Sequence, residues 1–251
     1  MKAQRIGKRL RRALDLFGLE RRCFACASVF EGRRDEQPSL FCPACTKLMP
    51  RRISGFCPLC GELAAWPTLP SSLCGNCLKE RPPWLDFFFH GPHEALLRTL
   101  LIKLKFGESP LLGHALGTLV SLHPGLSGLD ADVVAPVPLH ESRLIARGYN
   151  QALEIAKPLA SRLGLPLEPG LITRTRATPP QIGASRANRQ ENTQRAFLAA
   201  GTVKGAHVLL VDDTLTTGAT MAETANTLLR AGARLVSAAV VSRTPLHYRG
   251  N

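Results

Sequence analysis

The sequence predicts an α/β fold in which a parallel-sheet domain is preceded by a small zinc-ribbon module with four-cysteine metal sites. Two observations lead to this prediction. All eight cysteines lie within the first 77 of 251 residues, and segments typical of buried strands alternate with segments typical of amphipathic helices from residue 84 onward. Such alternation indicates a parallel sheet with helices on both faces. Hydrophobic residues make up 45% of the chain, which is enough for a substantial core.

The eight cysteines form four CxxC pairs. These are Cys23 and Cys26, Cys42 and Cys45, Cys57 and Cys60, and Cys74 and Cys77. Two thiolates three positions apart on a tight turn can bind one tetrahedral ion. Because 15 residues separate the first two pairs and 13 the last two, we expect two structural zinc sites with sequential pairing. A cross-braced arrangement, first pair with third and second with fourth, stays open, whereas disulfides are disfavoured because no export signal is visible.

The chain is expected to have three parts. These are a basic amphipathic helix at residues 1–22, a double zinc ribbon at 23–83 and the α/β domain at 84–251. One face of the first segment is apolar and the rest carries arginine and lysine, which fits a helix docked on the body better than a membrane anchor. Pro82 and Pro83 mark the end of the cysteine-rich part.

The charge balance is strongly basic. Lysine and arginine total 32 against 19 acidic residues, a formal net charge of +13, which favours partners such as nucleic acid, nucleotides or acidic membrane surfaces. No run of ~18 apolar residues is present, so no membrane span is expected. The amino-terminal residues also lack the continuous apolar core of a secretory signal, and we therefore expect a cytoplasmic protein.

Apolar periodicity locates the elements of the α/β domain. A continuous apolar run indicates a strand buried on both faces, and apolar residues three and four apart indicate a helix with one buried side. We expect helices at 94–106, 110–122, 149–163 and 220–230, and strands at 85–89, 132–138, 171–176, 207–211 and 235–241. A polar, basic tract occupies residues 177–195.

The stretch VLLVDDTLTTGAT, residues 208–220, places two adjacent carboxylates where a buried strand should end. Thr220 and Glu223 have the spacing of a capping box, which predicts a helix starting there. In an open parallel sheet such a loop lies at the edge where ligands bind, and the helix N-terminus attracts an anion. Asp212 and Asp213 can accept hydrogen bonds from two neighbouring ribose hydroxyls. The stretch therefore predicts a ribose 5-phosphate site.

Other interpretations of this stretch are weaker. A Walker A loop needs a lysine before its Ser/Thr and a dinucleotide fingerprint needs G-x-G-x-x-G, and neither pattern is present. A phosphoreceiver domain needs further elements downstream, and only 38 residues follow Asp213. A solvated turn with a good helix cap would leave the repulsion between the two neighbouring acids uncompensated.

The same stretch resembles the phosphoribosyl pyrophosphate (PRPP) signature of type I phosphoribosyltransferases. With APVPLHESRLIARGYNQALEIAKPLASRLGLP, TRTRATPPQIGASRANRQENTQRAF and the cysteine pairs, the chain is similar to the ComF family of competence-associated, phosphoribosyltransferase-like proteins from Cys23 onward. The resemblance implies that Asp212 and Asp213 contact the ribose and that Mg²⁺ bridges substrate oxygens. The implied 5-phosphate loop comprises Thr214, Leu215, Thr216, Thr217, Gly218, Ala219 and Thr220, and the implied pyrophosphate loop comprises Val137, Pro138 and Leu139.

The chemistry that the resemblance implies is displacement of pyrophosphate from C1 of the ribose by a nitrogen nucleophile. Stabilising the leaving group requires cations, and Arg147 is our choice as catalytic partner of Asp212 and Asp213, with pairing to Glu141 or solvent as the alternative. Other basic residues would serve either a lid over the diphosphate or a nucleic-acid surface. They are Lys103, Lys105, Arg174, Arg176, Arg186, Arg189 and Arg195. No residue presents itself as a general base.

Two functions remain open from the sequence. The protein is either a Mg²⁺-dependent transferase that moves the phosphoribosyl group of PRPP to an undefined acceptor, in DNA uptake or nucleotide metabolism, or a non-enzymatic competence factor with a sensing or vestigial PRPP site. The second would bind single-stranded DNA and work with DNA-uptake proteins. Trp66, Trp84 and Phe87–Phe89 would then stack on bases, although filling the core is the more common role of such aromatics.

Overall fold

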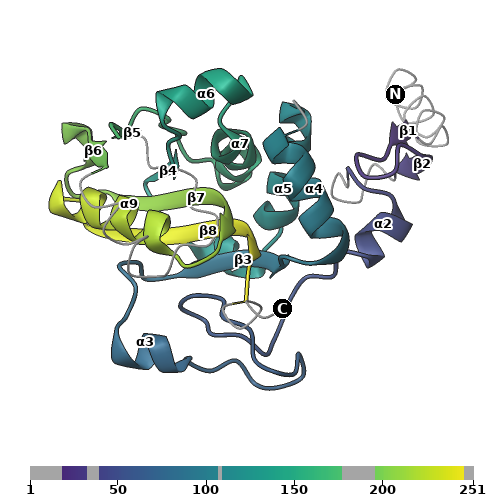
Figure 1. The fold of residues 1–251 in the computed structure, drawn as a ribbon, viewed down its shortest axis with the longest axis horizontal. Coiled ribbons are helices and arrows are strands. Elements are labelled where there is room, and N and C mark those ends of the chain that lie inside the picture. The colour runs from purple at the N-terminus through teal and green to yellow at the C-terminus, as the bar shows by residue number, and fades with distance from the viewer. Residues whose placement is uncertain (1–18, 33–39, 107–108, 177–195, 246–251) are drawn as a thin grey trace, which may run out of the picture. The chain divides into compact units, whose positions relative to one another are not determined.

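Two compact units, Met1–Leu48 and Met49–Asn251, make up the chain in the computed structural model shown in Figure 1. The structure describes residues 19–32, 40–106, 109–176 and 196–245.

In the first unit, strands β1 (Leu19–Arg22) and β2 (Val29–Gly32) form an antiparallel pair, and the short helix α2 (Pro43–Lys47) follows. The last four residues of the predicted helix 1–22 are therefore a strand, because they pair with β2. Residues 1–18 of that helix lie outside the described residues.

The second unit is built on a four-stranded sheet of order β3-β8-β7-β4 in which all neighbouring strands are parallel. The strands are β3 (Phe87–Pro92), β8 (Leu235–Arg243), β7 (His207–Leu215) and β4 (Val133–Pro136). The central strands β7 and β8 consist mostly of buried residues, as expected of strands covered on both faces. The predicted parallel sheet is confirmed.

Helices cover both faces of this sheet. The helices of the second unit are α3 (Gly75–Lys79), α4 (Ala95–Phe106), α5 (Pro110–Ser121), α6 (Glu141–Arg147), α7 (Gln151–Leu163) and α9 (Ala219–Arg230), with short 3-10 helices at Pro124–Gly128 and Gly201–Val203. Of these, α5, α7 and α9 make the main contacts with the sheet. Helices α5 and α7 pack on each other and on the sheet, and α9 packs on β7 and β8 (Figure 1). Met221 and Leu228 of α9 cluster with Leu210 of β7, while Leu209, which points to the other face, is equally buried.

One predicted strand does not join the sheet. The segment predicted at 171–176 contributes β5 (Ile172–Arg174), which pairs antiparallel with β6 (Phe197–Ala199) in a separate two-stranded sheet. Helix α6 was not predicted at all. In the described part of the chain, no helix has both the length and the hydropathy that crossing a membrane requires.

The second cysteine group belongs to the same compact unit as the sheet, whereas the sequence predicted a boundary near residue 83. The physical reason is a shared apolar core. Phe56 and Leu63, on either side of the third CxxC pair, pack against the core cluster of the sheet. The rings of Phe56 and Phe89 meet edge to face at 5.1 Å. This part of the predicted ribbon therefore folds onto the α/β domain.

The aromatic side chains near residue 84 fill this core. Trp84 and Phe87–Phe89 are all buried, with Phe89 only 1% exposed. Buried rings cannot stack on nucleic-acid bases, so the core-filling interpretation is the correct one for these four residues. Trp66 differs from them because it is 68% exposed.

Phe89→Ala should lower the free energy of unfolding by about 3–5 kcal/mol, because it removes a fully buried ring that joins the sheet to the second cysteine group. Urea denaturation of the zinc-loaded protein measures this. Phe106→Ala is the matched control, since Phe106 is 79% exposed, and should change stability by less than about 0.5 kcal/mol. Equal effects of the two substitutions would contradict the described core.

Candidate functional site

The segment that joins β7 to α9 is shorter than predicted, because β7 ends later and α9 begins earlier than the sequence indicated. Strand β7 continues through both aspartates to Leu215, past the predicted end at Val211. Helix α9 begins at Ala219, and Gly218 precedes it with φ of 82°, a left-handed conformation that favours glycine. The connection is therefore only residues 216–218, which we call the β7–α9 loop, and it presents the N-terminus of α9 at the carboxyl edge of the sheet.

The predicted capping box is wrong. Thr220 already lies inside the first turn of α9, and its side chain is not the helix cap. The Glu223 carboxylate instead accepts a hydrogen bond from Arg230 Nη2 at 2.9 Å. Because the left-handed glycine starts the helix one residue earlier than predicted, these two side chains cannot cap it. The Ala219 amide donates to Thr217 Oγ1 at 3.4 Å, while helix geometry leaves the next two amides without an acceptor inside the helix, so that they can meet an anion.

Asp212 and Asp213 are consecutive residues of one strand, so their side chains leave opposite faces of the sheet. The Asp213 carboxylate is buried; its Oδ2 accepts no hydrogen bond but lies 3.2 Å from Lys105 Nζ of α4. Asp212 is half-buried and its Oδ1 accepts a hydrogen bond from the Asp213 amide at 2.8 Å. Lys105, predicted for a lid or a nucleic-acid surface, thus belongs to the aspartate pair.

The electrostatics of the pair bear on ligand binding. Burial, and after it the neighbouring Asp213 charge, raise the pKa of Asp212 to about 7, while Lys105 and Arg174 oppose the rise. Near neutral pH the pair therefore carries less than two full charges. A cation or hydroxyl donors at this position would favour the charged form of Asp212.

The predicted pyrophosphate loop follows β4, the strand beside β7. The Val137 amide donates to the Val211 carbonyl at 2.8 Å, directly before the aspartates. Val137 and Pro138 are buried and Leu139 is half-buried. Asn150, which the sequence analysis missed, holds the loop by donating from Nδ2 to the Val137 carbonyl at 3.1 Å.

Asn150 also caps α7, since its Oδ1 accepts from the Ala152 amide at 3.0 Å. An asparagine at the start of an apolar helical pattern is the sequence signal that could have identified it.

Arg147 ends α6, immediately before Gly148. Its Nη1 donates to Gln151 Oε1, one turn further along the chain, rather than to Glu141. Within the described residues, none of the hydrogen bonds or ion pairs brings Arg147 to Asp212 or Asp213. The structure therefore does not join the predicted catalytic arginine to the acids.

The remaining predicted cations are dispersed. Arg174 of β5 lies over the Phe197 ring, 5.3 Å from its centroid, and burial lowers the pKa of Arg174 while Asp212 opposes the shift. Arg176 and Lys103 are exposed. Arg186, Arg189 and Arg195 lie outside the described residues.

Two polar side chains at the carboxyl ends of β3 and β8 were missed by the sequence analysis. His93 Nδ1 lies 2.9 Å from Ser242 Oγ, and Ser242 Oγ donates to Thr214 Oγ1 at 3.3 Å. Burial lowers the pKa of His93, with Lys105 and Arg98 adding to the shift and Asp213 opposing it. Three adjacent strands thus bring polar groups to one edge of the sheet. The sequence does not reveal this grouping, because the three groups lie in separate segments.

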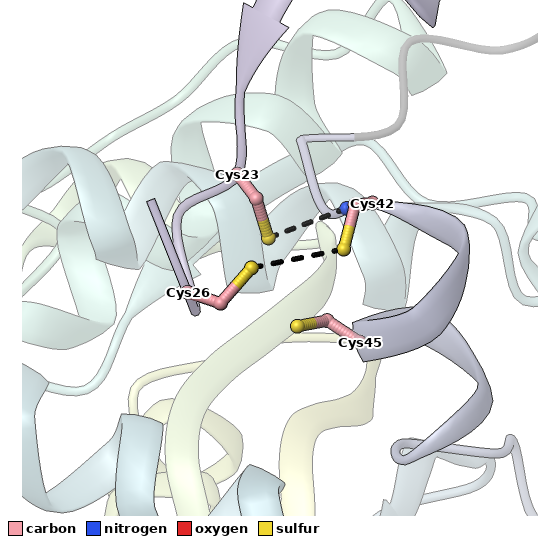
Figure 2. A group of neighbouring side chains, drawn as sticks. All are labelled: Cys23, Cys26, Cys42 and Cys45. Carbon is pink, nitrogen blue, oxygen red and sulfur yellow. Dashed lines mark hydrogen bonds between the residues drawn. The ribbon is translucent and has the colours of Figure 1, made fainter. Parts of the chain in front are cut away.

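The first cysteine group unites Cys23, Cys26, Cys42 and Cys45, and Figure 2 shows the four sulfur atoms facing one another. All lie within 4.8 Å of one another, and Cys26 and Cys42 Sγ are 3.8 Å apart. A tetrahedral zinc site with Zn–S bonds of about 2.3 Å needs sulfur separations of about 3.8 Å. The amides of Ala25 and Cys42 also donate to Cys23 Sγ, at 3.4 and 3.3 Å, as thiolate ligands require.

The second group unites Cys57, Cys60, Cys74 and Cys77 in the same way, with Cys60 and Cys74 Sγ 3.6 Å apart. Sequential pairing of the CxxC motifs is therefore confirmed, and the cross-braced alternative is excluded. Both groups fit a zinc ion in ligand number, ligand type and spacing.

The thiols of each group differ in acidity. Hydrogen bonds from Ser28 lower the pKa of Cys26 to about 6, and burial raises the pKa of Cys77 to about 12. Four thiols held together cannot all ionise without a cation, and a divalent metal removes this conflict by binding the thiolates.

A model of the phosphoribosyl transferase domain matches residues 149–248, which include Asp212, Asp213 and the β7–α9 loop. The parallel-sheet unit is thus a phosphoribosyltransferase-like domain. The chain belongs to the ComF family, as its curated relatives show. It is 38% identical over 208 residues to DNA utilization protein YhgH of Salmonella typhimurium, covering 81% of this chain and 90% of that protein.

Competence protein F of Haemophilus influenzae is 30% identical to this chain over 203 residues, covering 76% of this chain and 85% of that protein. Among solved structures, glutamine PRPP amidotransferase from Bacillus subtilis is 25% identical over 53% of this chain and 26% of that chain, with a TM-score of 0.36. A structural similarity this low carries no argument about function.

Metal analysis should find two zinc ions per chain, because the eight thiols form two closed four-sulfur groups. Cys45→Ser and Cys77→Ser should each lose one zinc ion, measured by elemental analysis after gel filtration. Thr46→Ser, beside a ligand but not one itself, should retain both. Fewer than two zinc ions in the unsubstituted protein would contradict the assignment.

The raised pKa of Asp212 predicts a stability that falls as pH rises from about 4 towards 7, because the folded state holds a proton that the unfolded chain releases. Asp212→Asn removes this penalty. At pH 8 its free energy of unfolding should therefore be about 1–3 kcal/mol higher than that of the unsubstituted protein. The difference should vanish near pH 4. Urea titrations across pH measure it, with Asp130→Asn, at an exposed aspartate, as the control substitution.

Proposed function

We propose that this protein binds PRPP with Mg²⁺ at the carboxyl edge of β4 and β7 and acts as a phosphoribosyltransferase on an undefined acceptor. The observation that carries the proposal is the juxtaposition of Asp212 and Asp213 with the short loop and free helix N-terminus that follow them. Diol-binding acids and an anion-binding helix end, separated by one loop, match the two ends of a ribose 5-phosphate.

Each part of the ligand has a proposed partner. The ribose hydroxyls would donate to Asp212. They would also donate to Asp213 once the Lys105 ammonium moves away from its carboxylate. The 5-phosphate would accept from first-turn amides of α9 and from the Thr216 and Thr217 hydroxyls of the β7–α9 loop, which are not buried. The pyrophosphate would lie against the backbone of residues 137–139.

Mg²⁺ fits the chemistry of the site because the half-buried carboxylate of Asp212 is a hard oxygen ligand whose raised pKa a cation would reverse. Bound with PRPP, Mg²⁺ would neutralise charge on the pyrophosphate oxygens. Arg147 remains the proposed cation beside the leaving group, held by Gln151.

The biological role is proposed from the relatives. The proteins similar to this chain are named for DNA utilization and competence, and the formal net charge of +13 favours a polyanionic partner. We therefore propose that the protein has a role in DNA uptake or use. The alternative is a non-enzymatic protein that binds single-stranded nucleic acid electrostatically and uses PRPP as a signal, since the buried aromatics remove a stacking platform.

Calorimetric titration of PRPP with Mg²⁺ tests the site. The double variant Asp212→Asn/Asp213→Asn should weaken PRPP binding at least tenfold, because it removes charge-assisted hydrogen bonds worth about 1.5–3 kcal/mol each. Asp130→Asn should bind as the unsubstituted protein does. Unchanged affinity in the double variant would mean that the pocket lies elsewhere.

Pyrophosphate release on addition of candidate nitrogen nucleophiles separates the two functions. Release by the unsubstituted protein, and none by the double variant, would establish a transferase. Steeply salt-dependent binding of an oligonucleotide that ignores the double substitution, without pyrophosphate release, would favour the alternative.

A further inference from the structure

Arg243, the last residue of β8, lies between the β7–α9 loop and the second cysteine group. Its side chain is only 2% exposed, yet its guanidinium reaches two separate segments. Nη1 donates to the carbonyls of Leu215, at 3.0 Å, and of Thr216, where the loop leaves the strand. Nε donates to the carbonyl of Cys60 at 2.9 Å. One side chain therefore joins a cysteine of the metal group to the start of the loop.

The charge of this arginine is balanced from the cysteine side. Nη2 of Arg243 donates to Glu62 Oε2 at 2.6 Å, and Glu62 is itself only 8% exposed. Removing one partner of a buried ion pair leaves an uncompensated charge, which is strongly unfavourable. The guanidinium is consequently held at one place, because its hydrogen bonds point in fixed directions. Its position depends on where the third CxxC turn holds the Cys60 carbonyl and Glu62.

A second link runs through Trp84. The indole Nε1 donates to the carbonyl of Leu59, inside the same CxxC turn, at 2.6 Å. The far end of the same ring, Cη2, lies 3.8 Å from the point where a Cβ would stand on Gly218. Trp84 is 7% exposed and therefore held in place by its surroundings. The CxxC turn thus contacts the β7–α9 loop at both ends, through Arg243 at residues 215 and 216 and through Trp84 at Gly218.

We infer that the metal bound by Cys57, Cys60, Cys74 and Cys77 sets the conformation of the β7–α9 loop, with Arg243 and Trp84 as the positioning residues. Loading of the second cysteine group and binding of a sugar phosphate at the loop are then thermodynamically coupled. The ligand half of this inference rests on the proposed function; the connection between metal and loop does not.

The coupling follows from what the metal fixes. Cys60 supplies a sulfur ligand and, from the same residue, the carbonyl that accepts from Arg243. Without metal, the four-sulfur group loses the bonds that hold this turn, and both carbonyls at 59 and 60 lose their fixed positions. Coupling is reciprocal, so a ligand that orders the loop must also strengthen metal binding at the second group.

The experiment measures the rate at which an excess of a zinc-selective chelating dye removes each zinc ion, with and without PRPP and Mg²⁺. The first cysteine group, in the other compact unit, is the internal reference, and Cys26→Ser identifies its kinetic phase. PRPP should slow zinc release from the second group by about threefold to tenfold, as expected for one or two hydrogen bonds. Release from the first group should not change.

Two substitutions test the positioning residues. Trp84→Phe removes the hydrogen bond to Leu59 and should abolish most of the protection by PRPP, whereas Trp66→Phe, at the exposed tryptophan, should leave it intact. Arg243→Lys keeps a charge for Glu62 but cannot span both segments, and should act as Trp84→Phe does. If the buried Arg243→Lys variant does not fold, the tryptophan pair alone decides the outcome.

A third comparison needs no ligand. Gly218→Ala places a side chain at a positive φ of 82° beside Trp84 and should speed zinc release from the second group by about threefold. Gly164→Ala, at φ of 66° with no atom within 4 Å of the added Cβ, imposes similar backbone strain at a helix end elsewhere and should not.

The outcomes separate the inference from the proposed function. PRPP that binds without slowing release from the second group, or that slows both groups equally, would overturn the inference and leave the proposed function standing. PRPP that does not bind would overturn the proposed function, and the two glycine variants would then decide the inference. Equal release rates in Gly218→Ala and Gly164→Ala would overturn it in that case.

Discussion

Two carboxylates side by side at the end of a buried strand are costly, and much of the surrounding structure offsets that cost. Asp213 has Lys105 at 3.2 Å, and Asp212 has the Asp213 amide and the field of Arg174. The compensation is incomplete, because the pKa of Asp212 still rises to about 7. Partly uncompensated negative charge at a sheet edge indicates a ligand site, because hydroxyl donors or a cation from a ligand would supply the missing interactions.

The geometry of the parallel sheet explains why other polar groups gather there. Strands β3, β8, β7 and β4 all point the same way, so their carboxyl ends meet at one edge. His93, Ser242, Thr214 and the residues after β4 reach that edge from four distant segments. Loops at such an edge are where open α/β sheets bind ligands.

The two cysteine groups share a ligand pattern but differ in surroundings. The buried apolar residues described in the first unit are Phe41 and three of its own cysteines, so a metal would be the centre of that unit's core. The second group lies against a large apolar core through Phe56 and Leu63 and reaches the sheet edge through Arg243. A metal in the second group would therefore be connected to the β7–α9 loop, whose conformation matters for the proposed binding of a sugar phosphate.

The aspartate motif, the four cysteine pairs and the alternation of strands and helices could all be predicted, because each depends on residues close together in the sequence. The capping box failed for a local reason: a left-handed glycine started the helix one residue earlier. The contacts of Lys105 with Asp213, of Asn150 with the Val137 carbonyl and of His93 with Ser242 could not be predicted, because the partners are 13 to 149 residues apart.

By itself, the sequence determined the α/β class, the sequential metal groups and the identity of the acids, since periodicity and ligand spacing are properties of short segments. Only the tertiary structure decided that the second cysteine group shares a core with the sheet and that Asp213 pairs with Lys105. It also decided that a buried arginine, Arg243, contacts Cys60, which lies 183 positions earlier in the chain. Chain folding brings such groups together through packing of whole elements, and no local pattern records that distance.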